Sequence, residues 1–156
     1  MPAAADRLPY VDEHSIEIEA DSEATWEAAS RVVDGSFAST ASSAFARLLG
    51  CADVEASGPR PLAVGSTFPG FRVEAAERPR LLGLGGSHRF SRYALIFRVE
   101  DLGGGRTRLR AETRAEFPGL KGRAYRALVI GTRGHVLLLR RQLAAAKRRA
   151  ERGRSR

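Results

Sequence analysis

The sequence has few of the side chains that build covalent or metal-centred sites. Its 156 residues include one cysteine, Cys51, and three histidines. A single cysteine excludes an internal disulfide framework and any CxxC site, which fits a reducing compartment. Because the histidines have no suitably spaced carboxylates beside them, we expect no metal site. Cys51 is interpreted as a small, inert hydrophobic side chain.

The motifs of the common nucleotide-dependent and hydrolytic enzymes are also missing. No P-loop lysine pattern, HExxH or GxSxG occurs in the chain. The stretch GLGGSH (83–88) is similar to a dinucleotide-binding loop, but His88 stands where the third glycine belongs, and a strand is expected next. No nucleophile has an obvious partner base. The sequence therefore predicts no cofactor and identifies no catalytic residue.

Long apolar runs are absent as well. The N-terminus MPAAADRLPY lacks the basic start and apolar run of a secretory signal. No uncharged run approaches the roughly 18 residues that a membrane helix needs. With 43% hydrophobic residues, the chain fits one soluble domain, and we expect it to be cytoplasmic. We place this domain at 12–150, between a flexible N-terminus (1–11) and a basic tail (151–156).

Positive charge is concentrated near the C-terminus. Residues 140–156 carry eight basic side chains against Glu151 alone, which gives +7 of the net charge of +8. This cluster contains no aromatic side chain, whereas nucleic-acid-binding surfaces interleave cations with aromatic stacking residues. The pattern therefore does not favour nucleic acid as a partner. It is typical of a solvated helix end, and a docking patch for phosphate-rich partners is the alternative.

The middle of the chain is predicted to form antiparallel strands separated by Gly and Pro turns. The predicted strands are HSIEIEA (14–20), GFRVEAAE (70–77), LLGLGG (81–86), RFSRYALIFRVE (89–100) and TRLRAETRAEF (107–117). Alternation in the last two strands places Tyr93, Phe97 and Thr113 on an apolar face. Pairing these strands by opposite charge sets Glu100–Arg108 and Arg92–Glu116 together, but it also sets Arg98 against Arg110.

Three helices are expected. The first begins at an N-cap formed by Asp21 or Ser22 and runs to Gly35, and the second covers Thr40–Leu49 and ends at Gly50. The third is one long helix over GRAYRALVIGTRGHVLLLRRQL (122–143), with its apolar side toward the inner face of the sheet.

The long helix contains Gly131, Gly134 and His135 near its centre. Each interior glycine costs a helix roughly 0.5–1 kcal/mol relative to alanine. A buried histidine without a partner also costs roughly 1–3 kcal/mol. We therefore expect the surrounding structure to use this space, either for close backbone packing or for a cavity that the histidine faces.

The order of these elements, and the opening IEIEADSEATWEAA, resemble the START-like superfamily of birch-pollen allergens, lipid-transfer START domains and polyketide cyclases. The stretch FPGLKGRAYRALVIGTRGH (117–135) is similar to bacterial START-like proteins of uncharacterised function. This resemblance implies an α+β helix-grip fold, in which a curved antiparallel sheet wraps a long C-terminal helix and two short helices follow the first strand. It also implies a cavity for a lipid, sterol, flavonoid or polyketide.

The resemblance and the strand faces together suggest a set of ligand-contacting residues. The candidates are His135, Tyr93, Thr113, Phe97, Leu128, Thr132, Leu139 and Trp26. His135 is interpreted either as a core histidine bonded to a neighbour such as Thr113 or Tyr93, or as a ligand contact, or as an acid/base group. Trp26 is either a packing anchor or a stacking surface, and His88 lies either at the pocket mouth or in an exposed loop.

Binding of a small hydrophobic molecule by a monomer or weak homodimer is thus the function that we expect. One alternative is a polyketide cyclase or aromatase, which requires an inward acid/base cluster such as His135 with Tyr93. A second alternative is a protein-interaction module, in which Ile130 and Leu137 on the arginine side of the final helix contact a partner.

Overall fold

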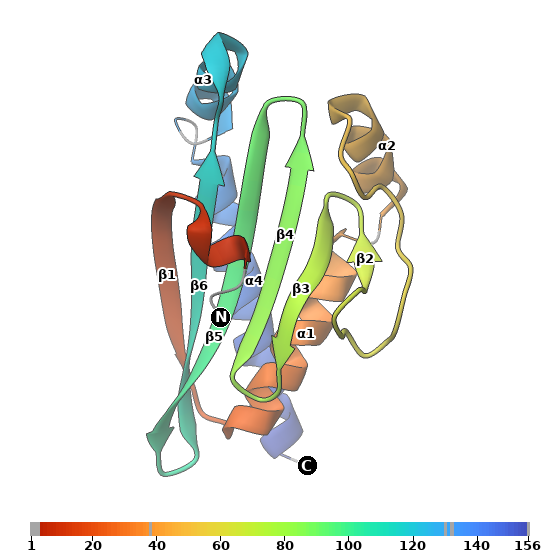
Figure 1. Cartoon of the computed structure of the whole chain (residues 1–156). Coiled ribbons are helices and arrows are strands. Elements are labelled where there is room, and N and C mark those ends of the chain that lie inside the picture. Colours follow the sequence, from red (N-terminus) through yellow and green to blue (C-terminus); the bar gives the residue numbers. More distant parts are fainter. Residues whose placement is uncertain (1–3, 38, 130, 132, 156) are drawn as a thin grey trace.

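A curved sheet organises the molecule. The computed structural model describes residues 4–37, 39–129, 131 and 133–155. Its elements are the short 3₁₀-helix η1 (Ala4–Arg7), β1 (Tyr10–Ile18), α1 (Ser22–Phe37), α2 (Thr40–Leu49), β2 (Thr67–Phe68), β3 (Phe71–Glu77), β4 (Leu81–His88), β5 (Ser91–Gly103), β6 (Arg106–Glu116), α3 (Gly119–Val129) and α4 (Gly134–Arg154). Within the described residues, six strands form an antiparallel sheet in the order β1-β6-β5-β4-β3-β2 (Figure 1). The predicted α+β fold class is confirmed.

Strands β5 and β6 pair in the register that their charged residues predicted. The expected pairs Glu100–Arg108, Arg92–Glu116 and Arg98–Arg110 all lie opposite one another on β5 and β6. The like charges of the third pair are compensated in part, because Arg110 contacts Glu13 on β1 at 2.8 Å. Alternation along these strands therefore leaves an ionic outer face and an apolar inner face.

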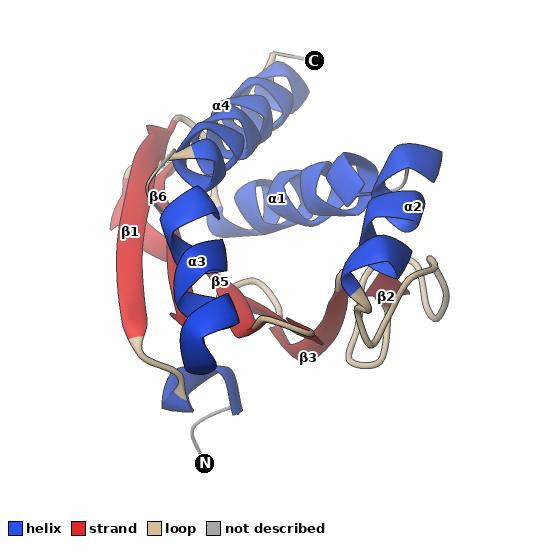
Figure 2. Ribbon diagram, turned by 90° about the horizontal axis from the view of Figure 1, so that it is seen from above, coloured by secondary structure: helices blue, strands red, loops and turns tan. Residues whose placement is uncertain are grey.

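Helices α1 and α4 pack against each other on the inner face of the sheet (Figure 2). Helix α1 begins as predicted, because the Asp21 carboxylate accepts a hydrogen bond from the Ala24 amide at 2.8 Å. Thr25 on this helix shares a buried hydroxyl–hydroxyl hydrogen bond of 2.7 Å with Thr107 on β6. The hydrophobic core lies between these helices and the sheet.

Helix α2 has the predicted bounds and both of its ends are capped. The Ser39 hydroxyl accepts a hydrogen bond from the Ser42 amide at 3.0 Å, and Gly50 ends the helix with a left-handed φ of 72°. Figure 1 shows α2, α3 and the β4–β5 turn at the same end of the sheet.

The prediction of one helix over residues 122–143 is wrong, because the chain breaks between α3 and α4. Arg133 adopts a left-handed φ of 56°, which interrupts the helical hydrogen-bond ladder. At Gly131 a Cβ would stand 2.2 Å from the Ala127 carbonyl oxygen, so the turn requires glycine. The apolar spacing continues across the break, which explains why the sequence pattern does not reveal it.

Of the two helices that replace the predicted long helix, α4 is the one that packs on the sheet, with Leu139, Gln142 and Leu143 buried on its predicted apolar side. It continues to Arg154, beyond the domain limit predicted at 150. Two residues of the predictions, Thr132 and Ile130, lie outside the described residues, while Leu137 is 53% exposed. Among the described helices, none is both long and apolar enough to cross a membrane.

Candidate functional site

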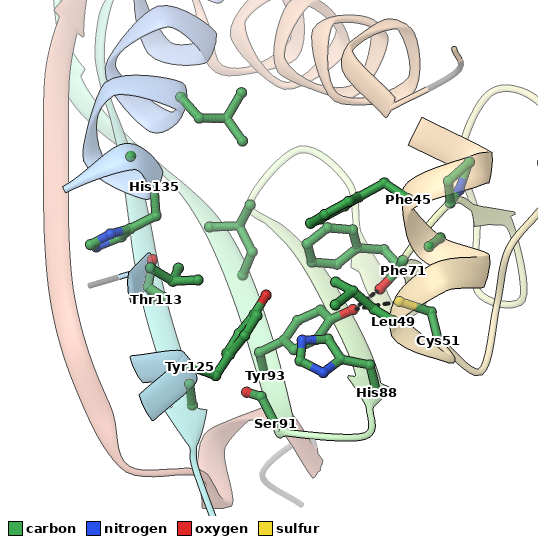
Figure 3. A pocket seen from close by; sticks show the side chains of 18 of the residues that line it. Phe45, Leu49, Cys51, Phe71, His88, Ser91, Tyr93, Thr113, Tyr125 and His135 are labelled. Carbon is green, nitrogen blue, oxygen red and sulfur yellow. Dashed lines mark hydrogen bonds between the residues drawn. The ribbon is translucent and has the colours of Figure 1, made fainter. Parts of the chain in front are cut away.

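A cavity of about 590 Å³ lies between the inner face of the sheet, α2, and the junction of α3 with α4 (Figure 3). It is lined by Phe37, Ser42, Phe45, Ala46, Leu49, Cys51, Pro69, Gly70, Phe71, His88, Ser91, Tyr93, Ala94, Leu95, Thr113, Ala115, Phe117, Tyr125, Leu128, Val129, Gly134, His135, Leu138 and Leu139. No Asp, Glu, Lys or Arg occurs among these described lining residues. Its volume falls in the range of about 300–1,000 Å³ that is typical of small-molecule sites.

Aromatic rings form one wall of the cavity. The rings of Phe37 and Phe71 lie 4.8 Å apart between centroids, and the Tyr93 ring meets Phe71 edge-on at 5.2 Å. These residues come from α1, β3 and β5. Because aromatic pairs in this geometry stabilise each other beyond their buried area, the wall is set by the fold rather than by a ligand.

The Tyr93 hydroxyl is engaged by the protein itself. It donates to the Gly70 carbonyl oxygen at 2.6 Å, and the Cys51 sulfur lies 3.8 Å from it. Burial is the main cause of a raised pKa at Tyr93 and also at Cys51. Both groups are therefore neutral near pH 7.

His88 lies at the end of β4 and is surrounded by aromatic rings. Its Nδ1 atom accepts a hydrogen bond from the Phe90 amide at 3.1 Å. Its ring meets the Tyr125 ring edge-on at 4.6 Å between centroids. Burial lowers the pKa of His88 below its ordinary value of 6.5 and raises the pKa of Tyr125, so both side chains are neutral near pH 7.

His135 is held by strand β1. Its Nε2 atom lies 2.7 Å from Asp12 Oδ2, and the same oxygen lies 3.3 Å from His14 Nε2. Figure 3 shows the His135 imidazole directed toward β1, away from the other labelled cavity side chains. Asp12, rather than the expected Thr113 or Tyr93, is therefore its hydrogen-bond partner. The His135 Nδ1 atom is buried without a partner among the described residues.

The structure brings most of the predicted site residues to this cavity. His135, Tyr93, Thr113, Leu128 and Leu139 all line it.

Phe97 and Trp26 lie outside the cavity lining, in the hydrophobic core. Strand alternation places Phe97 on the correct face, but at about 3.3 Å per residue it lies about 13 Å along β5 from Tyr93. Trp26 is 4% exposed, and its indole N–H donates to the Leu81 carbonyl at 3.4 Å. Trp26 thus occupies the packing position that was one of its two interpretations.

Several lining residues were not among the predicted contacts. Cys51, His88 and Tyr125 belong to a loop, a strand end and a helix that meet only in the tertiary structure. The position of His88 at a pocket mouth was one of the two interpretations of the sequence. The sequence carries no comparable signal for Cys51, since a lone cysteine indicates no site by itself.

Comparisons with known proteins support the fold. No protein-family model matches the sequence, and no curated protein is significantly similar to it. A norcoclaurine synthase point mutant of Thalictrum flavum, solved with a transition-state analogue, is 13% identical with a TM-score of 0.60, over 95% of this chain and 99% of that chain. The same plant's norcoclaurine synthase in complex with dopamine and hydroxybenzaldehyde is 14% identical with a TM-score of 0.54, over 90% and 83% of the two chains.

A protein from Arthrobacter aurescens, solved in solution by NMR, is 14% identical with a TM-score of 0.52, over 86% of this chain and 84% of that chain. Each of these likenesses covers 86% or more of this chain. The chain therefore has the same fold as these proteins, with the curved antiparallel sheet and long C-terminal helix of the helix-grip fold that the sequence predicted.

Proposed function

We propose that the cavity binds an uncharged, mainly apolar small molecule of the lipid, polyketide or aromatic type. The observation that carries this proposal is the cavity of about 590 Å³ whose described lining contains no Asp, Glu, Lys or Arg. A charged ligand would lose its hydration there without gaining an opposite charge, which is strongly unfavourable. An apolar ligand gains free energy from the aliphatic and aromatic walls.

The shifted pKa values support the same conclusion. Burial lowers the pKa of His88 and raises the pKa values of Cys51, Tyr93 and Tyr125. Each of these shifts favours the uncharged form of the side chain near pH 7. These four side chains therefore act as neutral hydrogen-bonding groups.

The structural likeness agrees with a ligand of this kind. The norcoclaurine synthase of Thalictrum flavum holds dopamine and hydroxybenzaldehyde, so this fold can enclose small aromatic molecules. In the present chain the aromatic wall offers a planar ligand surfaces on which to stack.

Binding is favoured over a cyclase-type reaction by the state of the two predicted acid/base groups. Tyr93 donates its proton to Gly70, and the His135 Nε2 atom faces Asp12. Tyr93 therefore has no free proton for a ligand, and the His135 imidazole is directed toward β1 and away from the other labelled cavity side chains (Figure 3).

A fluorescence titration with the neutral apolar dye N-phenyl-1-naphthylamine tests the proposal. Ala115 on β6 is 6% exposed and lines the cavity, so Ala115→Phe fills part of it. Ala56 is exposed and does not line it, which makes Ala56→Phe the matched control. Far-UV circular dichroism shows whether each variant keeps its fold.

We expect saturable dye binding by the wild-type protein and by Ala56→Phe. Ala115→Phe should weaken the binding by about tenfold or more, because it removes space and apolar contact area. Equal affinities in the two folded variants, or no saturable binding by the wild-type protein, would contradict the proposal.

A further inference from the structure

The polar end of the cavity contains a chain of hydrogen bonds that the protein completes by itself. The Tyr93 hydroxyl has one proton, and it lies on the 2.6 Å bond to the Gly70 carbonyl. The Cys51 thiol, 3.8 Å from the same hydroxyl oxygen, must then be the donor toward Tyr93. The Cys51 and Tyr93 protons are therefore not available to a ligand.

Two other side chains at this end keep a proton that a ligand can use. The His88 Nδ1 atom accepts from the Phe90 amide, so the proton of the neutral imidazole is on Nε2. Tyr125 carries a phenolic hydroxyl, which Figure 3 shows directed into the cavity. Among the described residues, no hydrogen bond engages the His88 Nε2 atom or the Tyr125 hydroxyl.

These two donors lie next to each other. The His88 and Tyr125 rings meet at 4.6 Å between centroids with an interplanar angle of 76°. Both side chains line the cavity. We call His88 and Tyr125 the donor pair.

We propose that the donor pair recognises an uncharged acceptor oxygen, such as the carbonyl of a ketone, aldehyde, quinone or ester, on an otherwise apolar ligand. This inference rests on the proposed function and adds the chemical class of the ligand's polar group. A ligand hydroxyl could also accept from the donor pair, but its own proton would need a further acceptor, whereas a carbonyl oxygen uses both donors and brings no proton of its own. A carboxylate fits poorly because no cationic side chain occurs among the described lining residues.

Three probes with the same ring system test this inference by isothermal titration calorimetry. 2-Acetylnaphthalene carries the acceptor oxygen, 2-ethylnaphthalene replaces the carbonyl with a methylene group, and 2-naphthoate carries a negative charge. Tyr125→Phe removes one donor and keeps the ring. His88→Asn withdraws the donor from the Nε2 position, because the shorter Asn amide ends near the position of Nδ1, and its oxygen can still accept from the Phe90 amide. Tyr10→Phe is the control, since Tyr10 is 59% exposed and does not line the cavity.

We expect the wild-type protein and Tyr10→Phe to bind the ketone about tenfold more tightly than the hydrocarbon, and to bind the carboxylate most weakly. Tyr125→Phe should reduce the preference for the ketone, and adding His88→Asn should bring the two affinities within about twofold. If the double variant does not fold, the reduced preference in Tyr125→Phe alone decides the result.

Equal binding of the ketone and the hydrocarbon by the wild-type protein would overturn the inference but leave the proposed function intact. A preference for the carboxylate, or an unchanged ketone preference in Tyr125→Phe, would also overturn it. Failure of all three probes to bind the wild-type protein would overturn both the inference and the proposed function.

Discussion

Removing the Tyr93 hydroxyl should destabilise the protein although the aromatic ring remains. In Tyr93→Phe the 2.6 Å hydrogen bond to the Gly70 carbonyl is lost, and that carbonyl belongs to a buried glycine. A hydrogen bond contributes roughly 0.5–1.5 kcal/mol, and an unsatisfied buried partner costs roughly 1–3 kcal/mol. Since Tyr93 itself is half-buried, we expect the free energy of unfolding to fall by about 1–2 kcal/mol.

Urea unfolding followed by tryptophan fluorescence measures this loss. Trp26 is the single tryptophan and is 4% exposed, so its emission reports unfolding of the core. For a chain of this length the change corresponds to a decrease in Tm of roughly 2–8 °C. Tyr10→Phe, at an exposed position, should change the free energy of unfolding by less than about 0.5 kcal/mol. If both variants lost the same free energy, the assigned role of the Tyr93 hydroxyl would be refuted.

Three further predictions concern packing, ionic contacts and pH. Gly86→Ala should lower the free energy of unfolding by about 1–3 kcal/mol, because the added Cβ would stand 2.1 Å from a backbone carbonyl oxygen. Gly35→Ala, in open space on α1, should instead raise the free energy of unfolding by about 0.5–1 kcal/mol. Asp12→Asn and His135→Leu should show a coupling of about 1 kcal/mol in a double-mutant cycle measured by urea unfolding, since their side chains are in contact at 2.7 Å. Because burial lowers the pKa of His88, its contribution to stability is present above pH 6.5 and is lost as the pH falls, and His88→Asn should flatten this acid limb.

A specific result would contradict each of these three predictions. Equal effects of the two glycine substitutions would mean that the close approach at β4 is absent in solution. Additive effects of the Asp12 and His135 substitutions would contradict a stabilising contact between these two side chains. An acid limb of the same slope in His88→Asn and wild type, measured by urea unfolding between pH 5 and 8, would contradict the burial of the imidazole.

The sheet could be predicted from the sequence because two independent patterns agree there. Alternation fixes the faces of β5 and β6, and the glycine turn between them fixes their register, which the Glu100–Arg108 pair also favours. The bounds of α2 could be predicted because its stop signal, Gly50, has a local conformational cause. By contrast, β2 is only two residues long and is defined by its pairing with β3, so its own sequence is too short to show a periodic pattern.

The candidate site could be predicted only in part, because alternation gives the face of a residue and not its depth. Phe97 and Tyr93 share a face, but only Tyr93 reaches the open end of the sheet. The sequence did not predict the helix break for a similar reason, since Gly131 is compatible both with a cavity beside a helix and with a turn between two helices. In the structure Gly131 lies in a turn between two helices. His135 contacts Asp12 of β1, which lies more than a hundred positions away in sequence.

The central claim is that a neutral apolar molecule binds inside the cavity. Isotope-filtered NMR on labelled protein with unlabelled 2-acetylnaphthalene tests it most directly, because each intermolecular NOE places the ligand beside a particular side chain. We predict NOEs to Leu95, Thr113 and Tyr125, which line the cavity from β5, β6 and α3. NOEs confined to exposed side chains outside the cavity lining, such as Leu48 and Leu137, would contradict the claim.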